Sequence, residues 1–580
     1  MSGISENGGG NAPAAVFEFS HYGFQYEAQQ EPTLYDIDLV IHKGEKVLIA
    51  GPSGCGKSTL VHSMNGLIPF AYKGKRSGSL KLFGTETADL GIFEISTRVG
   101  TVLQDSDGQF VGMTVAEDIA FALENDCISE PELHEKVRTA AGLVHIEDHL
   151  SHAPGELSGG QRQRVAMAGV VVADVDVLLF DEPLANLDPA AGMDAVELID
   201  RLQEETGAAV VIVEHRIEDV LHRAVDRVVL MDRGHIVFDG TPDALLSSSC
   251  LPPCGIREPL YIAALRYAGV TVTEEMRPAS LSTLRLSEED KKKVADWFYE
   301  RPQRKKKAEG APLLTAEHVS YAYGNGRKAL SDVSLSIREG ECVAIVGKNG
   351  AGKTTFSKLV CGFLPLKEGK IRLREQDLDR LSIKERADHI GYVMQNPNQM
   401  ISKTMIKDEV QLGLKLRGLP EEEIERRYEK ALRVCGIWGF RNWPVSALSF
   451  GQRKRMTVAS ILVLDPEILI LDEPTAGQDY RHYTEIMEFL REVNEAGITV
   501  VIITHDMHLM LEYADRAFVF TGGELIADKA GAEVLTDPAL IEKASLKTTS
   551  LYGLALMCGI PEASEFAAHF VATERERKHQ

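Results

Sequence analysis

Two glycine-rich loops of the same kind lie far apart in the chain. GPSGCGKST occupies residues 51–59 and GKNGAGKTT residues 347–355, and both fit the pattern G-x-x-x-x-G-K-[ST]. Glycines in such a loop let backbone N–H groups approach phosphate oxygens, the lysine reaches the terminal phosphates, and the next hydroxyl ligates Mg²⁺. The residues expected to bind a nucleotide are Gly51, Ser53, Gly54, Gly56, Lys57, Ser58, Thr59, Gly347, Asn349, Gly350, Gly352, Lys353, Thr354 and Thr355. Ser58 and Thr354 are the hydroxyls expected on the metal.

Two acidic pairs could supply the remaining chemistry. The apolar runs at 175–183 and 467–474 read as buried strands that end in Asp181–Glu182 and Asp472–Glu473. Open α/β sheets bind ligands at the carboxyl ends of their strands. We expect each Asp to hold Mg²⁺ through its water shell and each Glu to polarise the water that attacks the γ-phosphate of ATP.

The loops require a strand before them and a helix after them. Residues 39–50 and 335–346 read as the strands that enter the loops, and the residues after Ser58 and Thr354 read as helices whose N-termini face the anion. This arrangement predicts an α/β fold with a nucleotide site in each half.

The whole set of motifs is repeated. Lys57 and Lys353 are 296 positions apart, and Asp181 and Asp472 are 291 apart, so the two halves differ by small loop deletions. We expect a disordered tail at 1–13, a first domain at 14–275 and a second at 311–580. Residues 257–270 and 548–560 look like short amphipathic helices, which suggests a small C-terminal helical appendage in each half.

The charged segment 276–310 is interpreted as a linker between the domains. Extended, its roughly 35 residues reach on the order of 115 Å, enough for both halves to face each other within one molecule. Its run RPQRKKK, at residues 301–307, is interpreted as a solvated stretch, with a binding patch as the alternative.

The composition excludes several classes of function. A formal net charge of −23 opposes nucleic-acid binding as a main activity. Hydrophobic residues make up 44% of the chain, and no run approaches 18 apolar residues, so no membrane span is expected. The N-terminus lacks the pattern of a signal peptide, and the eight cysteines are interpreted as reduced thiols.

A further motif makes a family resemblance specific. LSGGQRQR at 157–164 and LSFGQRKR at 448–455 stand between each loop and its acidic strand, where LSGGQ resembles the signature of ATP-binding-cassette (ABC) ATPases. The resemblance covers both repeats and implies two tandem nucleotide-binding domains, each with a RecA-like core and a helical subdomain. It also implies that the two cassettes pair head to tail, so that each signature contacts ATP bound by the other. The signature residues are Ser158, Gly159, Gly160, Gln161, Ser449, Gly451 and Gln452.

The resemblance assigns roles to further residues. Gln104 and Gln395 match the glutamine that contacts Mg²⁺ and the attacking water, and His215 and His505 match the switch histidine on the γ-phosphate. Tyr26 and Tyr323 match the aromatic residue on adenine, with Tyr22, Phe24 and Tyr321 as near alternatives. Asp188 and Asp479 end the loops that cross the interface between cassettes.

One departure predicts unequal sites. Phe450 replaces the first glycine of the second signature, which would close on ATP held by Lys57. The site with Lys353, Glu473 and Ser158 keeps the full pattern, so we expect unequal rates of hydrolysis.

Residues 104–125 and 395–418 resemble a segment of energy-coupling-factor (ECF) importer ATPases, although Ser106 stands where proline is usual. The resemblance implies uptake of a vitamin or other micronutrient through two separate membrane proteins, a scaffold subunit and a substrate-binding subunit. The chain would lie peripherally on the cytoplasmic face of the membrane. A tandem sugar-importer ATPase and an ABC ATPase acting on ribosomes are the alternatives; a DNA-repair ATPase would need zinc-ligand cysteine pairs that this sequence lacks.

Overall fold

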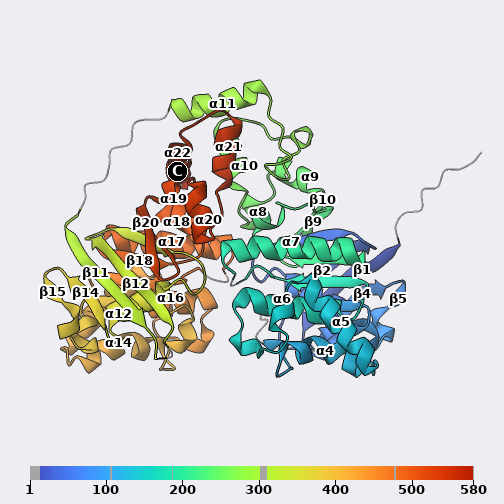
Figure 1. Ribbon diagram of the computed structural model, residues 1–580, viewed down its shortest axis with the longest axis horizontal. Helices are drawn as coiled ribbons and strands as arrows, with labels where there is room; N and C mark the ends of the chain where they lie inside the picture. The colour runs from blue at the N-terminus through green and yellow to red at the C-terminus, as the bar shows by residue number, and fades with distance from the viewer. Residues whose placement is uncertain are drawn as a thin grey trace, which may run out of the picture. The chain divides into compact units, whose positions relative to one another are not determined.

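The computed structural model describes residues 14–104, 108–185, 187–300, 310–324, 326–475 and 478–578. Figure 1 shows the chain as a ribbon. It forms two compact units. The first comprises Met1–Leu187, Ala191–Pro259 and Val272–Arg285, and the second comprises Asp188–Ala190, Leu260–Thr271 and Leu286–Gln580.

The first unit contains two sheets. One is antiparallel, in the order β2-β1-β4-β5, and its strands are β1 (Ala15–Tyr26), β2 (Leu34–His42), β4 (Gly74–Leu82) and β5 (Thr85–Glu86). The other has the order β10-β9-β3-β8-β7-β6, and only β10 pairs antiparallel. Its strands are β3 (Lys46–Ala50), β6 (Val99–Val102), β7 (Val177–Asp181), β8 (Ala209–Val213), β9 (Arg227–Asp232) and β10 (His235–Gly240). β3, β7 and β8 are buried throughout, as expected for parallel strands covered on both faces.

Helices connect these strands. They are α1 (Lys57–Met64), α2 (Leu67–Phe70), α3 (Ile92–Ser96), α4 (Val115–Asn125), α5 (Glu130–Leu143), α6 (Gly159–Val171), α7 (Pro189–Thr206), α8 (Ile217–Val220) and α9 (Pro242–Ser247). α4, α5 and α6 pack on one another between β6 and β7 in the chain and form the helical subdomain predicted for this half.

The second unit repeats the two sheets. The antiparallel sheet has the order β12-β11-β14-β15, with β11 (Pro312–Ala322), β12 (Lys328–Arg338), β14 (Glu368–Leu373) and β15 (Gln376–Asp377). The larger sheet has the order β16-β17-β18-β13-β19-β20, with β13 (Cys342–Val346), β16 (Ile390–Val393), β17 (Ile468–Asp472), β18 (Thr499–Ile503), β19 (Arg516–Thr521) and β20 (Glu524–Lys529).

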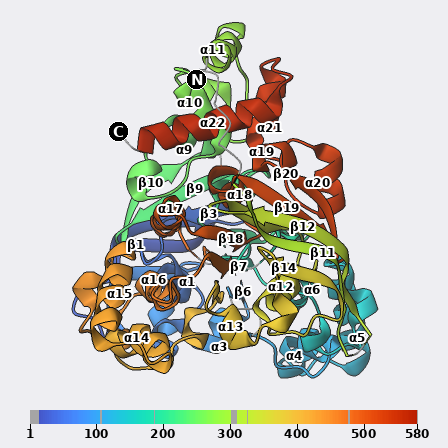
Figure 2. The ribbon, with the colours of Figure 1, turned by 90° about the vertical axis from the view of Figure 1, so that its left-hand side faces the viewer.

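The helices of the second unit include two from the middle of the chain. They are α10 (Leu260–Tyr267), α11 (Glu288–Tyr299), α12 (Lys353–Cys361), α13 (Ile383–Arg386), α14 (Ile406–Leu416), α15 (Glu421–Val434), α16 (Phe450–Leu462), α17 (Tyr480–Glu495), α18 (Met507–Tyr513), α19 (Gly531–Val534), α20 (Pro538–Ala544), α21 (Ser550–Met557) and α22 (Ala563–Lys578). Figure 2 shows α14, α15 and α16 side by side, in mutual contact.

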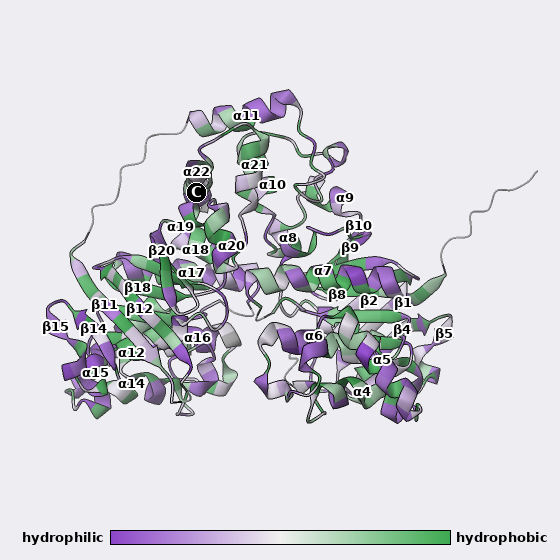
Figure 3. Ribbon diagram, in the orientation of Figure 1, coloured by the Kyte–Doolittle hydropathy of each residue, from purple (hydrophilic) through white to green (hydrophobic). Residues whose placement is uncertain are grey.

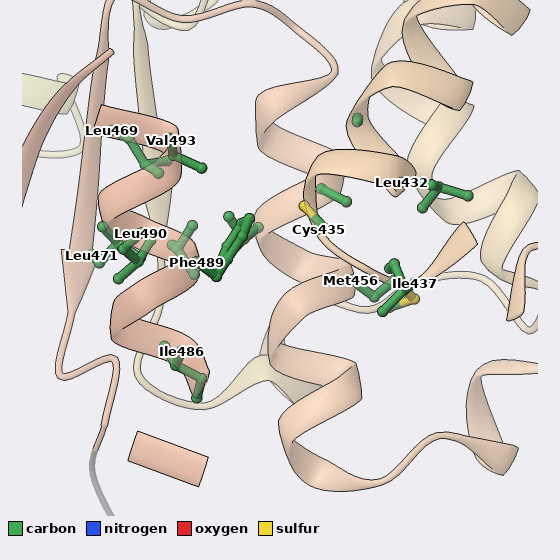
Figure 4. Close-up of a cluster of buried hydrophobic side chains, with 14 of the residues drawn as sticks. Leu432, Cys435, Ile437, Met456, Leu469, Leu471, Ile486, Phe489, Leu490 and Val493 are labelled. Atoms are coloured by element: carbon green, nitrogen blue, oxygen red, sulfur yellow. The ribbon is translucent and has the colours of Figure 1, made fainter. Parts of the chain in front are cut away.

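An apolar cluster joins that helical layer to the larger sheet. In Figure 4, Leu490 of α17 lies beside Leu471 of β17, and Phe489 projects from the other side of α17, in the direction of Met456 of α16. Figure 3 shows β18 as hydrophobic and much of α15 as hydrophilic, and α15 accordingly buries only one face. Burial of this kind contributes about 25 cal/mol per Å² of apolar surface and fixes α16 against the strand that carries Asp472.

The residues that enter each loop form two strands, where the sequence suggested one run. In the first half, β2 ends at His42 in the antiparallel sheet and β3 begins at Lys46 in the parallel sheet. Gly44, with a φ of 72°, lies in the turn between them. A left-handed φ favours glycine, so this turn is local evidence for the break.

The structure differs from the expected domain boundaries. α10 lies within the segment assigned to the first domain, but it groups with the second unit, where it contacts α21. The segment interpreted as a linker contains α11, in which Val294 and Phe298 are fully buried. Phe298 packs against Phe566 of α22. The charged residues around Val294 and Phe298 hide an apolar stripe at i,i+4 spacing. Residues 301–309, which include the whole basic run, and the expected tail at 1–13 lie outside the described residues.

The short amphipathic helices predicted at 257–270 and 548–560 are present as α10 and α21. Tyr267 of α10 stacks on Phe570 of α22 with ring centroids 5.5 Å apart, and its hydroxyl donates a hydrogen bond to Glu574. The ring centroids of Trp297 in α11 and His569 in α22 are 4.4 Å apart. The appendage helices of both halves therefore share one packed group within the second unit. Within the described ranges, no helix combines the length and apolar character needed to cross a membrane.

Candidate functional site

Each glycine-rich loop leads from a central strand into a helix. β3 ends at Ala50 and α1 begins at Lys57; β13 ends at Val346 and α12 begins at Lys353. The residue before each helix has a left-handed φ, 110° at Gly56 and 102° at Gly352. A Cβ at Gly352 would lie 2.5 Å from the carbonyl oxygen of Ala329, so only glycine fits there.

The two lysines of these loops are buried. Lys57 Nζ donates to the carbonyl oxygens of Gly51 at 2.7 Å and Pro52 at 2.9 Å. Lys353 Nζ donates in the same way to Gly347 at 2.6 Å and Lys348 at 3.1 Å. Burial lowers the pKa of Lys353, and the carboxylates of Glu473, Asp188 and Asp472 oppose that shift. The ammonium groups lie inside their own loops, where a phosphate would meet them.

The tyrosines expected beside adenine are tied to the helix that follows each loop. The Tyr26 hydroxyl lies 3.0 Å from Thr59 Oγ1, and the Tyr323 hydroxyl lies 3.0 Å from Thr355 Oγ1. In the first unit a second aromatic ring, Tyr72, meets the ring of Tyr26 edge-on with centroids 6.1 Å apart. These contacts place Tyr26 and Tyr323, as named by the resemblance, at equivalent positions.

The acidic pairs lie at the ends of β7 and β17, as predicted. Asp181 and Asp472 close their strands, and Glu182 and Glu473 follow with left-handed φ values of 49° and 47°. Such a conformation is unfavourable for glutamate by about 1–3 kcal/mol and persists where the surrounding structure enforces it. Because both glutamates have this backbone conformation, their side chains do not follow the alternating directions of the side chains in the preceding strand.

In the first unit Glu182 contacts the predicted glutamine. Gln104 Nε2 donates to Glu182 Oε2 at 2.7 Å, and His215 Nδ1 lies 3.9 Å from Glu182 Oε1. A third carboxylate, Glu214, is fully buried beside them and accepts from the backbone N–H groups of Leu184 at 3.1 Å and His215 at 2.9 Å. Glu214 thereby supports the backbone of the histidine and of the turn after Glu182.

In the second unit Glu473 contacts the predicted histidine instead. His505 Nδ1 lies 2.8 Å from Glu473 Oε1, a hydrogen-bonding distance. Behind the glutamate, Lys454 of α16 is buried and donates from Nζ to the Glu473 carbonyl oxygen at 3.0 Å. Burial lowers the pKa of Lys454 to about 8. The equivalent residue of the first unit is Gln163, which donates to the carbonyl oxygen of Pro183.

The two aspartates also differ in their surroundings. Burial, with the neighbouring Glu182 second, raises the pKa of Asp181 to about 6, and its Oδ1 is buried without a hydrogen-bond partner in the described part of the chain. Asp472 Oδ2 accepts from the Tyr392 hydroxyl at 2.8 Å and from Thr354 Oγ1 at 3.4 Å. Burial raises the pKa of Asp472 as well.

These groups make a suitable donor set for a hard divalent cation. In each unit a hydroxyl from the loop, Ser58 or Thr354, is hydrogen-bonded to the aspartate at the strand end. Oxygen donors of this kind suit Mg²⁺, which retains several waters and takes few protein ligands. Asp181 Oδ1, which has no hydrogen-bond partner among the described residues, is the kind of buried acceptor that such a hydrated ion would satisfy.

The signature serines begin the helices α6 and α16. The Ser158 hydroxyl accepts from the backbone N–H of Gln161 at 3.3 Å, and Ser449 accepts from Gln452 at 3.2 Å. Each glutamine side chain returns the bond to the backbone N–H of its serine, which completes a capping box. The motif therefore has a structural role in its own unit, and it leaves the glycine N–H groups at a helix N-terminus.

The remaining predicted residues are placed as follows. Asp479 is buried at the start of α17 and accepts from the backbone N–H of His482 at 2.9 Å. Asp188 groups with the second unit, and Gln395 is exposed just after β16. The side chain of Phe450 and all of Ser106 lie outside what the structure describes.

Sequence reasoning missed four contributors: Tyr392, Lys454, Gln163 and Glu214. Tyr392, Lys454 and Gln163 each contact a residue far away in the chain, so no short motif contains both partners. Glu214 is adjacent to His215, but its second partner, Leu184, lies 30 positions away. The available signal was the repeat itself. Superposing the halves pairs Tyr392 with Thr101, Lys454 with Gln163 and Glu214 with Thr504, which marks the positions where the two centres differ.

Comparison with known proteins identifies the family. A family model described as "ABC transporter" matches residues 34–185 and 330–476. A second model, described as "ATP-binding cassette cobalt transporter", matches residues 248–321. The first spans both loops and both acidic strand ends, and the second covers α10, α11 and all of β11 except its last residue.

Relatives match along almost the whole chain. One from Clostridium perfringens (strain 13 / Type A), whose name places it among ABC transporter ATP-binding proteins, is 54% identical over 97% of this chain and 99% of its own. One of similar name from Vibrio parahaemolyticus serotype O3:K6 (strain RIMD 2210633) is 50% identical over 97% and 98%. Among solved structures, cbiO1 from Clostridium perfringens, described as part of the ABC transporter complex cbiONQ, is 35% identical over 42% of this chain and 98% of that chain, with a TM-score of 0.38.

The loops, the acidic strand ends and the two capped signatures agree with the family that these matches define. The chain belongs to the ABC transporter ATPases: it carries two ABC ATPase domains and is an ATP-hydrolysing, ATP-binding subunit of an ABC transporter.

Proposed function

We propose that this chain is the energy-coupling subunit of an ECF-type importer that takes up a vitamin or other micronutrient. The observation that carries the proposal is the match of residues 248–321 to the cobalt-transporter family model, because that segment lies outside the two ranges that the general ABC transporter model matches. The partners are a membrane scaffold subunit and a membrane-embedded substrate-binding subunit, and the chain lies peripherally on the cytoplasmic face of the membrane.

Hydrolysis follows from the placement of the glutamates. Glu182 and Glu473 are the bases that orient a water for attack on the γ-phosphorus of ATP, and the bond to the β-γ bridging oxygen breaks to give ADP and phosphate. Gln104 and His505 each lie within hydrogen-bonding distance of their glutamate and hold its carboxylate. Lys57 and Lys353 bind the phosphates.

Mg²⁺ is the cofactor that the donor set fits. Ser58 and Asp181 would hold it in the first unit, and Thr354 and Asp472 in the second. Gln104 and Gln395 would contact the ion and the attacking water. When bound, the ion neutralises charge on the β- and γ-phosphates. The two cassettes are proposed to pair within one chain, with Ser158 and Ser449 each completing the site of the other cassette and Asp188 and Asp479 lying near that boundary.

The segment after Gln104 is the proposed contact with the scaffold subunit. Val111 is 64% exposed and Met113 is 82% exposed, and both immediately precede α4. In the second half Met400 is instead packed against the apolar cluster of the helical layer. Val111 is thus available to a partner, whereas a change at Met400 would disturb packing.

Co-purification tests the assignment. The full chain, expressed with the membrane proteins encoded beside it, should bring down a scaffold subunit and a small substrate-binding subunit. Val111→Glu should reduce that recovery and uncouple uptake while leaving ATPase and melting temperature unchanged. Recovery of two permease subunits with a periplasmic binding protein would indicate another importer class, and recovery of ribosomes alone would overturn the importer assignment.

A further inference from the structure

Tyr392 lies on β16, the strand next to the one that carries the acidic pair, at a position where the two units differ. β16 and β17 are parallel, and Tyr392 pairs with Ile470 in register. Asp472 lies two residues beyond Ile470, so both side chains project from the same face of the sheet. The phenol spans the two strands and donates to Asp472 Oδ2 at 2.8 Å.

The ring of Tyr392 is held by a second aromatic side chain. Phe363, just after α12, meets it edge-on with centroids 5.7 Å apart and an interplanar angle of 81°. Edge-to-face packing of this kind favours one ring orientation. The hydroxyl is therefore positioned by packing in addition to its hydrogen bond.

The first unit has no such donor at the equivalent position. Thr101 pairs with Leu179 in the same register, two residues before Asp181. Its hydroxyl accepts from Asn65 Nδ2 at 3.3 Å. Asp181 keeps a buried Oδ1 without a partner among the described residues. The same strand geometry thus carries a constrained aspartate in the second unit and a less constrained one in the first.

We infer that Tyr392 is a positioning residue for Asp472, which fixes the carboxylate of the second unit for Mg²⁺·ATP and has no counterpart in the first. The inference rests on the proposed role of Asp472 as a Mg²⁺-side ligand. Tyr392 is inferred to act without touching the nucleotide, through Asp472 alone. The hydroxyl of Thr354 contacts the same Oδ2 of Asp472.

The test isolates the second nucleotide site in the full chain by introducing Lys57→Ala. In this background we compare Tyr392→Phe, which removes only the hydroxyl, with Tyr428→Phe. Tyr428 donates to the Arg441 carbonyl at 3.0 Å in the helical layer of the same unit, so its variant loses a similar hydrogen bond elsewhere. Binding of a fluorescent ATP analogue is measured with EDTA and over a Mg²⁺ titration.

Tyr392→Phe should raise the half-saturating Mg²⁺ concentration about 10-fold, the order expected for loss of one hydrogen bond to a charged group. Affinity in EDTA should not change, and Tyr428→Phe should leave both quantities at the parent value. Adding Tyr392→Phe to Asp472→Asn should cause no further loss in Mg²⁺ dependence, since the tyrosine acts through the aspartate.

An unchanged Mg²⁺ titration in Tyr392→Phe would overturn the inference. So would an additive loss in the double variant, which would show an effect that bypasses Asp472. A parent protein whose nucleotide binding ignored Mg²⁺ would instead refute the proposed role of Asp472. If Tyr392→Phe lowered the melting temperature more than Tyr428→Phe did, Phe363→Leu, which loosens the ring but keeps the hydroxyl, should still raise the Mg²⁺ requirement; an unchanged requirement there would also overturn the inference.

Discussion

The two proposed hydrolytic centres use equivalent strands and the same backbone conformation at the glutamate, but different neighbours hold the carboxylate. Glu182 is bonded to Gln104, whereas Glu473 is within hydrogen-bonding distance of His505. The first centre adds a buried carboxylate, Glu214, and the second adds a buried ammonium group, Lys454. The duplicated motifs thus preserve the groups proposed to react, while the side chains that support them differ.

Replacing both glutamates should remove hydrolysis at both sites, and with it any difference between them. Glu182→Gln combined with Glu473→Gln should lower steady-state ATP hydrolysis by about 100-fold to 10,000-fold, because neither site retains a base. Phosphate release measures the loss, and a fluorescent ATP analogue should show that binding persists. Retained hydrolysis would mean that another group orients the water.

Single glutamate changes should expose the inequality. We expect Glu473→Gln to cost more hydrolysis than Glu182→Gln, because the second site has the histidine in contact and is expected to face the unmodified LSGGQ signature. Rates of phosphate release at saturating ATP decide this. Equal losses would show that the structural difference between the two centres does not affect hydrolysis.

A change in α11, which contributes no residue to either centre, tests whether the inequality lies in the centres themselves. Phe298→Ala, in the fully buried face of α11, should destabilise the chain by about 3–5 kcal/mol. Lys292→Ala, on the exposed face of the same helix, is the control. Melting measurements should separate the two, while below the transition the ratio of the single-glutamate losses should stay as before.

The smallest effect concerns the lysine behind Glu473. Its folded pKa of about 8 lies below the ordinary lysine value, so the unfolded chain binds more protons between these values and stability rises with pH through that window. Lys454→Gln, which installs the residue of the first unit, should therefore melt about 2–4 °C higher at pH 7.5, and the gain should shrink toward pH 10. Lys430→Gln, at an exposed position, should show no such trend. A gain independent of pH would refute the charge argument.

The sequence predicted the features that short motifs encode. The loops at Lys57 and Lys353 and the strand ends at Asp181 and Asp472 were predicted because glycine spacing and apolar runs are local patterns. Tyr392 could not be found in this way, since its meaning depends on pairing with a strand some 80 positions away. α11 was not predicted for a different reason: its charged face dominates its composition, and its partner Phe566 lies near the C-terminal end of the chain.

The shared packing of α10, α11 and α22 constrains how a gene for such a chain could be divided. A break within residues 301–309 would leave Val294 and Phe298 on one polypeptide and Phe566 on the other. Each product would emerge from the ribosome with an uncovered apolar face. Fusion supplies the partner helix at a high effective concentration. We therefore expect separately encoded halves to require co-expression for solubility. In the fused chain, packing of these helices should not depend on protein concentration.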